Sequence, residues 1–270
     1  MELPPPRRPD REDSHRGLAY ALWLPERIEA RQPNPDGSGR RMPDPPWPAV
    51  VICHGAGSRK ENHADFARMA AASGWAALAF DARGHGDSEG EMSRGAVEDV
   101  VEMVRLLAGT SGVDPRRVAV RGSSMGGFLA LHAAASAPEI AGVIAICPAG
   151  EGDLARGLRR GELEMRVGDE LALEAWLLGQ DLREAVVRVG ARPLILLHAE
   201  GDDQIPSERS AELYARAAEP RKLVLVPGGD HRSVQHDSEL QGMALRWLER
   251  ELAASATGRR APAGSCRECW

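Results

Sequence analysis

The chain has 270 residues, with 34 basic and 40 acidic side chains and a formal net charge of −6. This balance gives no support to nucleic acid or an anionic membrane as a partner. The four cysteines are too few and too unevenly spaced for a disulfide framework. No apolar run approaches the roughly 18 residues of a membrane span, and residues 1–13 lack the apolar centre of a signal peptide. We therefore expect a cytoplasmic protein that contacts no membrane.

The first part of the chain is irregular. Residues 1–15 are polar and Pro-rich, and we predict a flexible lead-in there. A strand is predicted over residues 17–25, which read GLAYALWLP. Residues 30–48 are rich in Pro and Gly and have no apolar periodicity, which is typical of a loop.

From residue 49 onward, continuous apolar runs alternate with amphipathic helical patterns. Runs that are apolar throughout predict strands buried on both faces, and their alternation with helices predicts a mostly parallel sheet with helices on both faces. The predicted strands are 49–54, 75–81, 117–122, 141–147, 193–199 and 222–227, and the predicted helices are 62–73, 93–108, 125–137, 207–218 and 237–252.

Residues 148–190 interrupt this alternation. The segment is charged and helix-prone, and Leu171, Ala175 and Leu178 give it an apolar stripe. After the last helix, residues 254–270 are rich in Ala, Gly and Arg and are predicted to form a flexible tail. Cys266 and Cys269 form a CxxC pair within that tail, and a lone pair of this kind is weak support for zinc.

A G-x-S-x-G pattern lies at the junction of a predicted strand and a predicted helix. It is formed by Gly122, Ser123, Ser124, Met125 and Gly126. The strand-to-helix context is the one that this motif requires, because a tight turn there exposes the central hydroxyl at a helix N-terminus. Ser124 is the candidate nucleophile. The alternative is a Gly/Ser loop that only joins two elements.

A serine nucleophile needs a base, and the base needs an orienting acid. In folds of this type the three follow in the order Ser, acid, His. Asp202 and Asp203 both follow the predicted strand 193–199, and His231 follows the predicted strand 222–227. His236 is the competing base, but it lies at the start of the last helix. Each of these residues alone is ordinary in a turn; their order makes a triad the better interpretation.

Stabilisation of an oxyanion needs two backbone N–H donors. The amide of Met125, directly after the nucleophile, is one candidate. The Gly-rich turn HGAGS at residues 54–58 offers the second, and Ala56 is the candidate donor there. The alternative for this segment is a plain glycine turn. His54 is interpreted as structural, because the chain order assigns the base to a later histidine.

Five segments together resemble the α/β-hydrolase superfamily, in its serine esterase or dienelactone-hydrolase-like branch. They are HGAG at residue 54, DARGHGDSEG at 81–90, GSSMGG at 122, GDDQIP at 201 and GGDH at 228. The resemblance runs from about residue 17 to 252. In such proteins the acid stands four residues before a proline, which favours Asp202 over Asp203, and His85 is a scaffold residue. The dienelactone hydrolases proper use a cysteine where this chain has Ser124.

The resemblance also implies a domain organisation. The α/β-hydrolase core would comprise residues 16–147 and 191–253, and residues 148–190 would form a small helical cap over the nucleophile. Most apolar side chains of the cap would hold it on the core. The candidate substrate-binding residues are Leu154, Leu158, Met165 and Trp176, with Leu163, Leu173 and Leu177 as further candidates.

The hypothesis is therefore a serine hydrolase that cleaves carboxylic esters or thioesters of small to medium acyl chains, by way of an acyl-enzyme. It needs no metal or organic cofactor. The alternatives are an aminopeptidase or amidase, or a perhydrolase, with the same triad, and a non-enzymatic binding module on the same scaffold. The expected partner is a small-molecule ester. The sequence leaves open a homodimer formed through the cap or the last strand.

Overall fold

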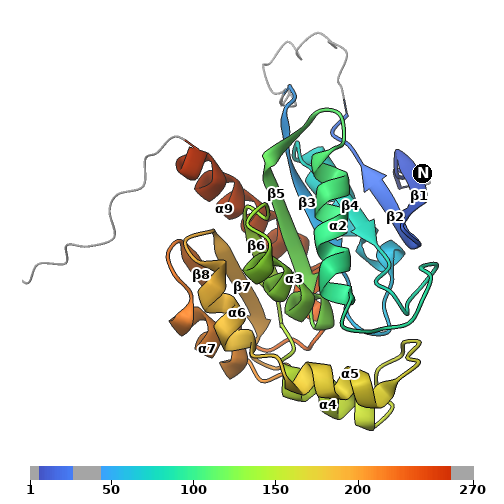
Figure 1. Ribbon diagram of the computed structural model, residues 1–270. Coiled ribbons are helices and arrows are strands. Elements are labelled where there is room, and N and C mark those ends of the chain that lie inside the picture. Colours follow the sequence, from blue (N-terminus) through green and yellow to red (C-terminus); the bar gives the residue numbers. More distant parts are fainter. Residues whose placement is uncertain (1–5, 27–43, 257–270) are drawn as a thin grey trace, which may run out of the picture.

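A single eight-stranded sheet forms the centre of the computed structural model, which describes residues 6–26 and 44–256. The strand order is β1-β2-β4-β3-β5-β6-β7-β8 (Figure 1). The pairs β1–β2 and β2–β4 are antiparallel, and the other pairs are parallel. The strands are β1 Arg11–His15, β2 Leu18–Trp23, β3 Trp47–Cys53, β4 Ala76–Phe80, β5 Val113–Ser123, β6 Val143–Ile146, β7 Leu194–Ala199 and β8 Arg221–Val226. This is the predicted α/β-hydrolase architecture.

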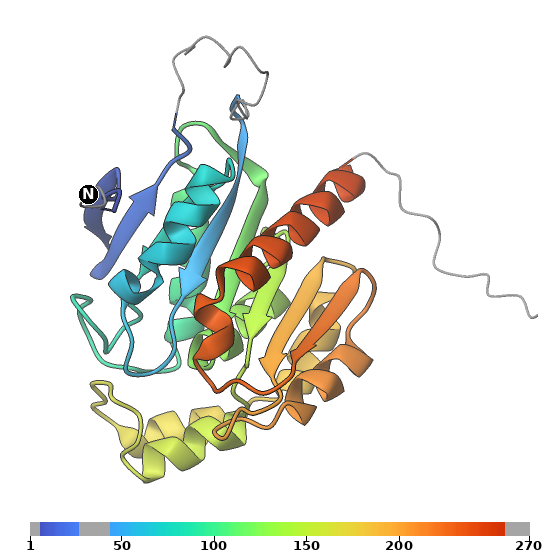
Figure 2. The same ribbon diagram turned by 180° about the vertical axis from the view of Figure 1, so that it is seen from behind.

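Helices cover both faces of the sheet. The helices α2 (Ala96–Ala108), α3 (Met125–Ser136), α6 (Leu182–Val189) and α7 (Glu208–Arg216) contribute to the core on one face. On the other face lie α1 (Ala64–Ala72) and α9 (Ser238–Ala256), which Figure 2 shows in front of the strands. The short elements η1 (Lys60–His63) and α8 (Ser233–His236) precede α1 and α9.

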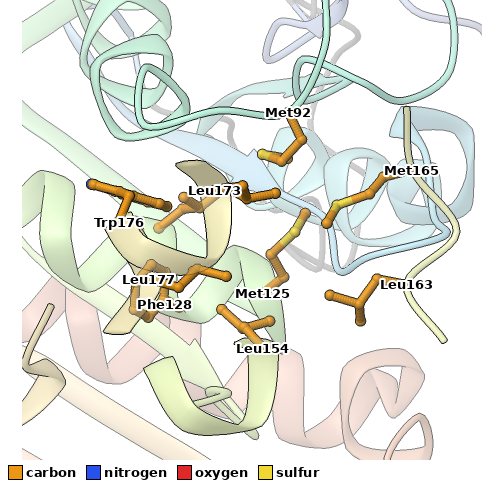
Figure 3. Close-up of a pocket in the computed structure, with 10 residues that line it drawn as sticks. Met92, Met125, Phe128, Leu154, Leu163, Met165, Leu173, Trp176 and Leu177 are labelled. Atoms are coloured by element: carbon orange, nitrogen blue, oxygen red, sulfur yellow. The ribbon is translucent and has the colours of Figure 1, made fainter. Parts of the chain in front are cut away.

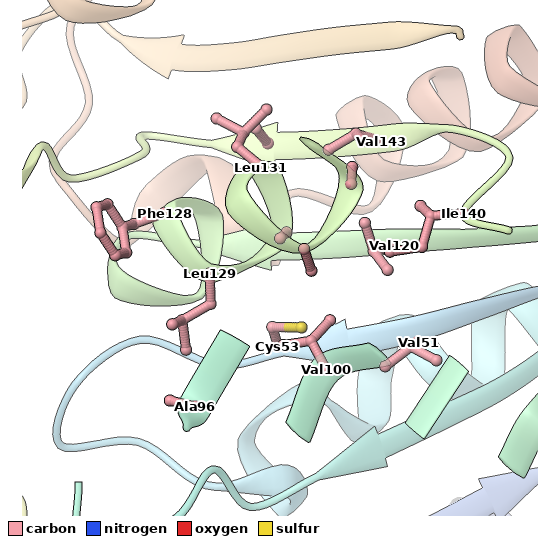
Figure 4. Packing of buried hydrophobic residues seen from close by; sticks show 14 of the residues in the cluster. Val51, Cys53, Ala96, Val100, Val120, Phe128, Leu129, Leu131, Ile140 and Val143 are labelled. Atoms are coloured by element: carbon pink, nitrogen blue, oxygen red, sulfur yellow. The ribbon is translucent and has the colours of Figure 1, made fainter. Parts of the chain in front are cut away.

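The core explains why the inner strands are apolar throughout. Every residue of β3, β4, β6 and β7 is buried, because helices pack on both faces of the sheet. Val100 of α2 lies beside Cys53 and Val51 of β3 (Figure 4). Phe128 and Leu131 of α3 and Val120 of β5 belong to the same buried cluster. The side chains interpreted as packing tryptophans, Trp23, Trp47 and Trp75, are all buried.

The predicted flexible lead-in at residues 1–15 is wrong for its last third. Arg11–His15 forms the edge strand β1, paired with β2 across a two-residue turn. Both turn residues, Arg16 and Gly17, have positive φ, as a type I′ hairpin requires. The strand is polar and mostly exposed because it lies at the edge of the sheet, so it carries no apolar pattern. Residues 1–5 lie outside the described residues.

The predicted cap is shorter than residues 148–190. Helices α4 (Glu151–Arg159) and α5 (Glu170–Leu178) lie beyond the carboxyl ends of the strands, whereas α6 packs beside α3 (Figure 1). Four of the five apolar side chains of α6 are buried in the core on the α3 side of the sheet, and only Val187 is exposed. The insertion therefore consists of α4, α5 and their connections.

The apolar stripe predicted for the cap is exposed to solvent and does not pack against the core. Leu171 and Leu178 are 80% and 53% exposed, and the buried side chains of α5 are Leu173 and Leu177. Almost every side chain in this helix is apolar, so periodicity could not select the buried face.

The C-terminal helix α9 continues to Ala256, past the predicted start of the tail at residue 254. Residues 27–43 and 257–270, with Cys266 and Cys269, lie outside the described residues. Among the residues that are described, no helix combines the length and apolarity needed to cross a bilayer.

Candidate active site

The Ser124 turn joins β5 to α3 in a strained conformation. Ser124 has φ 55° and ψ −119°, a region that non-glycine residues seldom occupy and that is often found at functional sites. The turn is possible because its flanks are glycine. A Cβ on Gly122 would lie 2.0 Å from the carbonyl oxygen of Gly126, and a Cβ on Gly126 would lie 2.2 Å from that of Cys53. The Ser124 side chain therefore stands at the N-terminus of α3.

The loop after β7 supplies a buried carboxylate that faces a histidine. His231 Nδ1–H donates to Asp202 Oδ2 at 2.7 Å. The amides of Gln204 and Ile205 donate to the other carboxylate oxygen at 2.9 Å each. The side chain of Asp202 is fully buried, whereas Asp203 is exposed. The structure thus brings together two of the three residues of the predicted triad.

A second histidine, which the sequence analysis did not single out, contacts the same carboxylate. His198 Nε2 lies 3.3 Å from Asp202 Oδ2 and 2.9 Å from the carbonyl oxygen of Ile205, and Ser210 Oγ–H donates to His198 Nδ1 at 2.7 Å. Burial alone would raise the pKa of Asp202, but hydrogen bonds from His198, His231 and Ile205 hold it well below its usual range. The sequence feature that could have identified His198 is its place inside the otherwise apolar strand β7.

Cys147 completes the group of side chains around Asp202. Its sulfur, a nitrogen of His198 and an oxygen of Asp202 lie within 4.8 Å of one another, a spacing that a metal ion could use. Burial raises the pKa of the Cys147 thiol to about 12, and the charge of Asp202 adds to the effect. A thiol that keeps its proton is a poor ligand, and His198 is already hydrogen-bonded. We name Cys147, His198, Asp202, Ser210 and His231 the Asp202 cluster.

Hydrogen bonds tie the segment after His231 to the strand that leads to Ser124. Ser123 Oγ–H donates to Gln235 Oε1 at 2.5 Å, and the Arg121 guanidinium donates to the carbonyl oxygen of Gln235 at 2.9 Å. Arg121 is fully buried and also donates to Gln241 at 3.0 Å. The second position of the motif, Ser123, therefore holds the segment after His231 against β5.

The hydroxyl of Ser124 and the imidazole of His231 share no hydrogen bond within the described part of the chain. Apo structures often show such contacts long, and they tighten when substrate binds. The competing histidine is elsewhere: His236 Nδ1 bonds to Asp65 at 3.0 Å, on the exposed side of α8. Among the candidate bases, only His231 contacts Asp202.

The predicted oxyanion loop runs beside the nucleophile. A Cβ on Gly55 would lie 3.3 Å from the Cβ of Ser124. Neither the amide of Ala56 nor that of Met125 donates a hydrogen bond to another described residue, so both donors remain available. Met125 is the first residue of α3, where an amide has no partner within the helix.

His54 fixes this loop. Its Nδ1–H donates to the carbonyl oxygen of Gly55 at 2.7 Å, and its Nε2 accepts from the amide of Ala82 at 2.9 Å. Burial, together with the nearby imidazole of His85, lowers the pKa of His54 to about 4. His54 is thus a neutral structural residue, as the sequence analysis held.

The segment DARGHGDS, which begins at Asp81, is bonded to the residues that follow the HGAGS loop. Asp81 accepts from the amide and the ammonium group of Lys60 at 2.7 and 2.9 Å, and from the amide of Asp87 at 2.9 Å. Gly86 has φ 43°, and a Cβ there would lie 2.2 Å from Asp81 Oδ2. The glycine is required for Asp81 to bind both segments.

An apolar slot lies between α3 and the insertion (Figure 3). Three of the four predicted substrate-binding residues line it: Leu154, Met165 and Trp176. The fourth, Leu158, is buried but is not part of the lining, so it serves packing instead. About 10 Å³ of the slot is open, so side chains nearly fill it. The complete lining of what we name the apolar slot is Met92, Met125, Phe128, Leu129, Leu154, Leu163, Met165, Leu173, Trp176 and Leu177.

Two bacterial proteins and one fungal structure illustrate what this chain resembles. It is 30% identical over 187 residues to an uncharacterized protein, Rv2307c, of Mycobacterium tuberculosis, covering 68% of this chain and 63% of that protein. It is 30% identical over 191 residues to the quorum-quenching protein AidA of Acinetobacter baumannii, covering 68% and 58%. The α/β hydrolase GrgF of Penicillium has a TM-score of 0.68 at 19% identity, covering 87% of this chain and 94% of that one.

The chain thus spans less than two thirds of the length of these two relatives. A family model described as "Serine aminopeptidase, S33" matches residues 44–189, which is more than half of the chain and contains the Ser124 turn. The chain belongs to this family of the α/β-hydrolase superfamily.

Proposed function

We propose that this protein is a serine hydrolase that cleaves carboxylic esters or thioesters of small to medium acyl chains. The observation that carries the proposal is the 2.7 Å hydrogen bond between His231 and the buried carboxylate of Asp202, in a loop that is bonded to the strand leading to the strained Ser124 turn. The three residues follow the order that this fold uses.

In the acylation step, His231 takes the proton of the Ser124 hydroxyl as the oxygen attacks the acyl carbon. Asp202 fixes the tautomer of His231 and stabilises the imidazolium that forms. The amides of Ala56 and Met125 donate to the developing oxyanion, where one donor is typically worth about 3–4 kcal/mol. His231 then returns the proton to the leaving alcohol or thiol.

In the deacylation step, His231 accepts a proton from water as the water attacks the acyl-enzyme. The proton then returns to Ser124 as the acid product leaves. The apolar slot begins at Met125, directly after the nucleophile, and suits an acyl chain. No step requires a metal or an organic cofactor.

Amide or peptide cleavage is the second candidate function, because the family is described by its serine aminopeptidases. An aminopeptidase must recognise a free amino group, for which a carboxylate is the natural partner. The ten residues that line the apolar slot include none. We therefore place ester cleavage first. A perhydrolase reaction would use the same triad and remains an alternative.

The deciding experiment compares Ser124→Ala with Ser123→Ala on p-nitrophenyl butyrate and on an amino-acid p-nitroanilide. Loss of the nucleophile should cost about 10⁴-fold or more in kcat. Ser123→Ala removes the bond to Gln235 Oε1, but Arg121 still donates to the carbonyl oxygen of Gln235, so the variant should keep most of the activity. Near wild-type turnover by Ser124→Ala would overturn the proposal, and faster cleavage of the anilide than of the ester would favour the second candidate.

A fluorophosphonate probe separates enzyme from binding module. An activated serine should be labelled in the wild-type protein and spared in Ser124→Ala. A wild-type protein that is folded but unlabelled and inactive would support the binding module.

A further inference from the structure

A second hollow adjoins the apolar slot at Trp176. This side chain closes the end of the slot opposite Leu163 and Met165 (Figure 3), and it also lines a groove of about 300 Å³ between α2, α3 and α6. The polar groups of the groove come from Arg94, His132, Ser136, Gln180 and Arg188. We name it the cationic groove, because its lining contains two guanidinium groups and no carboxylate.

The two arginines of the cationic groove are unpaired. In the parts of the chain that the structure describes, neither Arg94 nor Arg188 forms an ion pair or a side-chain hydrogen bond, although the protein is acidic overall. Other exposed arginines, such as Arg216, are also unpaired among the described residues, whereas the partly buried Arg83 pairs with Asp99 at 2.6 Å. What distinguishes Arg94 and Arg188 is that they line the same hollow. Two free guanidinium groups beside one hollow favour an anionic ligand.

A buried histidine forms the floor of the cationic groove. His132 is 5% exposed, and its Nε2 is buried without a hydrogen-bond partner among the described residues. Burial and the charge of Arg188 lower the pKa of His132 to about 4, against the opposing effect of Asp181. Asp181 itself is bonded to Arg183 and caps α6. An anion in the groove would offset the charge of Arg188.

The neighbouring hollow does not suit an anion. It shares Arg94 and Trp176 with the cationic groove, but its lining also includes Glu91 and Asp169. These carboxylates would repel a second negative charge. The anion is therefore expected at the end of the groove near Arg188 and His132.

The helix α3 sets the distance between the nucleophile and the groove. Met125 begins the helix beside Ser124, and His132 lies seven residues later on the same side, with Phe128 between them in contact with both His132 and Trp176. Seven residues of α-helix advance about 10 Å. An extended chain advances about 3.5 Å for every three bonds, so about eight or nine bonds cover that distance.

We propose that the cationic groove binds a carboxylate at the far end of the acyl chain, so that the preferred substrate is a monoester of a dicarboxylic acid of about eight carbons. The methylene chain lies in the apolar slot and passes Trp176. The three methionines of the slot adapt their shape to admit it. Water adds across the acyl C–O bond and releases the dicarboxylic acid and the alcohol. This inference rests on the proposed ester hydrolysis.

The test uses p-nitrophenyl monoesters of dicarboxylic acids from four to twelve carbons. Each is paired with its neutral methyl ester of the same length, and p-nitrophenolate release is followed for both. The ratio of kcat/KM, acid over methyl ester, should be greatest near eight carbons, at about tenfold, since each exposed ion pair contributes up to about fivefold. The ratio should also shrink at high salt.

The double variant Arg94→Gln with Arg188→Gln should bring this ratio close to one. Arg216→Gln, an exposed arginine on α7 away from the groove, should keep the wild-type ratio. Calorimetry with Ser124→Ala gives a second readout: it should bind p-nitrophenyl hydrogen suberate more tightly than the methyl ester, and the added arginine substitutions should abolish the difference.

Hydrolysis of the neutral esters without any preference for the acids, at any length, would overturn the inference and leave the proposed function intact. Equal binding of both suberate esters to Ser124→Ala would overturn it as well. Failure of the wild-type protein to hydrolyse either the acid or the neutral esters would instead count against the proposed function. The calorimetric comparison would still show whether the cationic groove binds a carboxylate.

Discussion

The Asp202 cluster and the apolar slot are built from opposite kinds of contact. In the Asp202 cluster, the carboxylate accepts from two backbone amides and from His231, with His198 and Cys147 close by. The apolar slot offers only carbon and sulfur atoms, and three of its residues are methionine. Hydrogen bonds hold the Asp202 cluster in place, whereas the apolar slot is held by van der Waals packing alone.

This difference separates two tasks. Hydrogen bonds fix positions to a few tenths of an ångström, which a proton transfer needs. Methionine packs loosely and changes shape at low cost, which suits chains of varied length. Substitutions in the Asp202 cluster should therefore reduce kcat, whereas substitutions in the slot should change which substrate is preferred.

The largest expected effect comes from Asp202→Asn. The amide can still occupy the site, but it favours the wrong tautomer of His231 and cannot stabilise the imidazolium. We expect kcat on p-nitrophenyl butyrate to fall by about 10³–10⁴-fold with little change in KM. Steady-state kinetics with the purified variant gives the result.

Asp203→Asn is the matched control, because its carboxylate is exposed and the two residues are adjacent. It should keep wild-type kinetics. If the two variants lost similar activity, the assignment of the orienting acid to Asp202 would be wrong.

Acid should destabilise the loop that His54 fixes through its bonds to Gly55 and Ala82. The pKa of His54 is about 4 in the folded chain, below its ordinary value of 6.5, so the unfolded chain binds the extra proton first. Stability is therefore complete above pH 6.5 and falls as the pH drops towards 4, by about 3 kcal/mol for this group. Asp202 adds a further loss only below pH 3.8, where its carboxylate becomes protonated in the unfolded chain.

Urea unfolding at several pH values between 7.5 and 4.5 measures this slope. His54→Asn should be less stable at pH 7.5 but should depend less on pH. His236→Asn, at an exposed position, should keep the wild-type slope. An unchanged slope in His54→Asn would show that another group controls acid unfolding.

The sequence predicted the sheet well because the inner strands are buried on both faces and are therefore apolar throughout. It missed β1, whose polar residues lie at an edge, and it chose the wrong face of α5, which is apolar on nearly every side. Asp202 and His231 follow strand ends, where chain order is informative. His198 and Arg121 are buried polar residues inside strands. The partner of Arg121, Gln235, lies 114 residues away in the chain, whereas the partners of His198 follow within twelve residues, in a loop and a helix whose position beside β7 the apolar pattern does not specify.

His198→Phe should have an intermediate effect. It removes an N–H group that faces Asp202, so the carboxylate stabilises the imidazolium of the resting enzyme more strongly, and a smaller fraction of His231 is neutral and free to act as the base. We expect kcat/KM to fall about tenfold, since a hydrogen bond to a charged group is worth about 1.5–3 kcal/mol. The acid limb of the pH–rate profile should move to higher pH.

His198→Gln restores a donor and should recover much of the activity and the wild-type acid limb. Circular dichroism and the unfolding midpoint establish that each variant folds. A loss of activity without movement of the acid limb would mean that His198 only fills space.

The smallest effect is expected in the apolar slot, where Met165→Ala and Leu158→Ala form a contrasting pair. Both side chains come from the insertion, but only Met165 lines the slot. Met165→Ala should move the optimum of a p-nitrophenyl ester series, from acetate to dodecanoate, towards longer chains. The ratio of kcat/KM for long over short chains should rise by only about two- to threefold, because neighbouring methionines partly refill the space. Leu158→Ala should lower stability, since it deletes a buried side chain, and should leave the optimum in place. If Leu158→Ala moved the optimum as far as Met165→Ala, chain length would be set by how the insertion packs as a whole, and the slot could not be treated as a separate region.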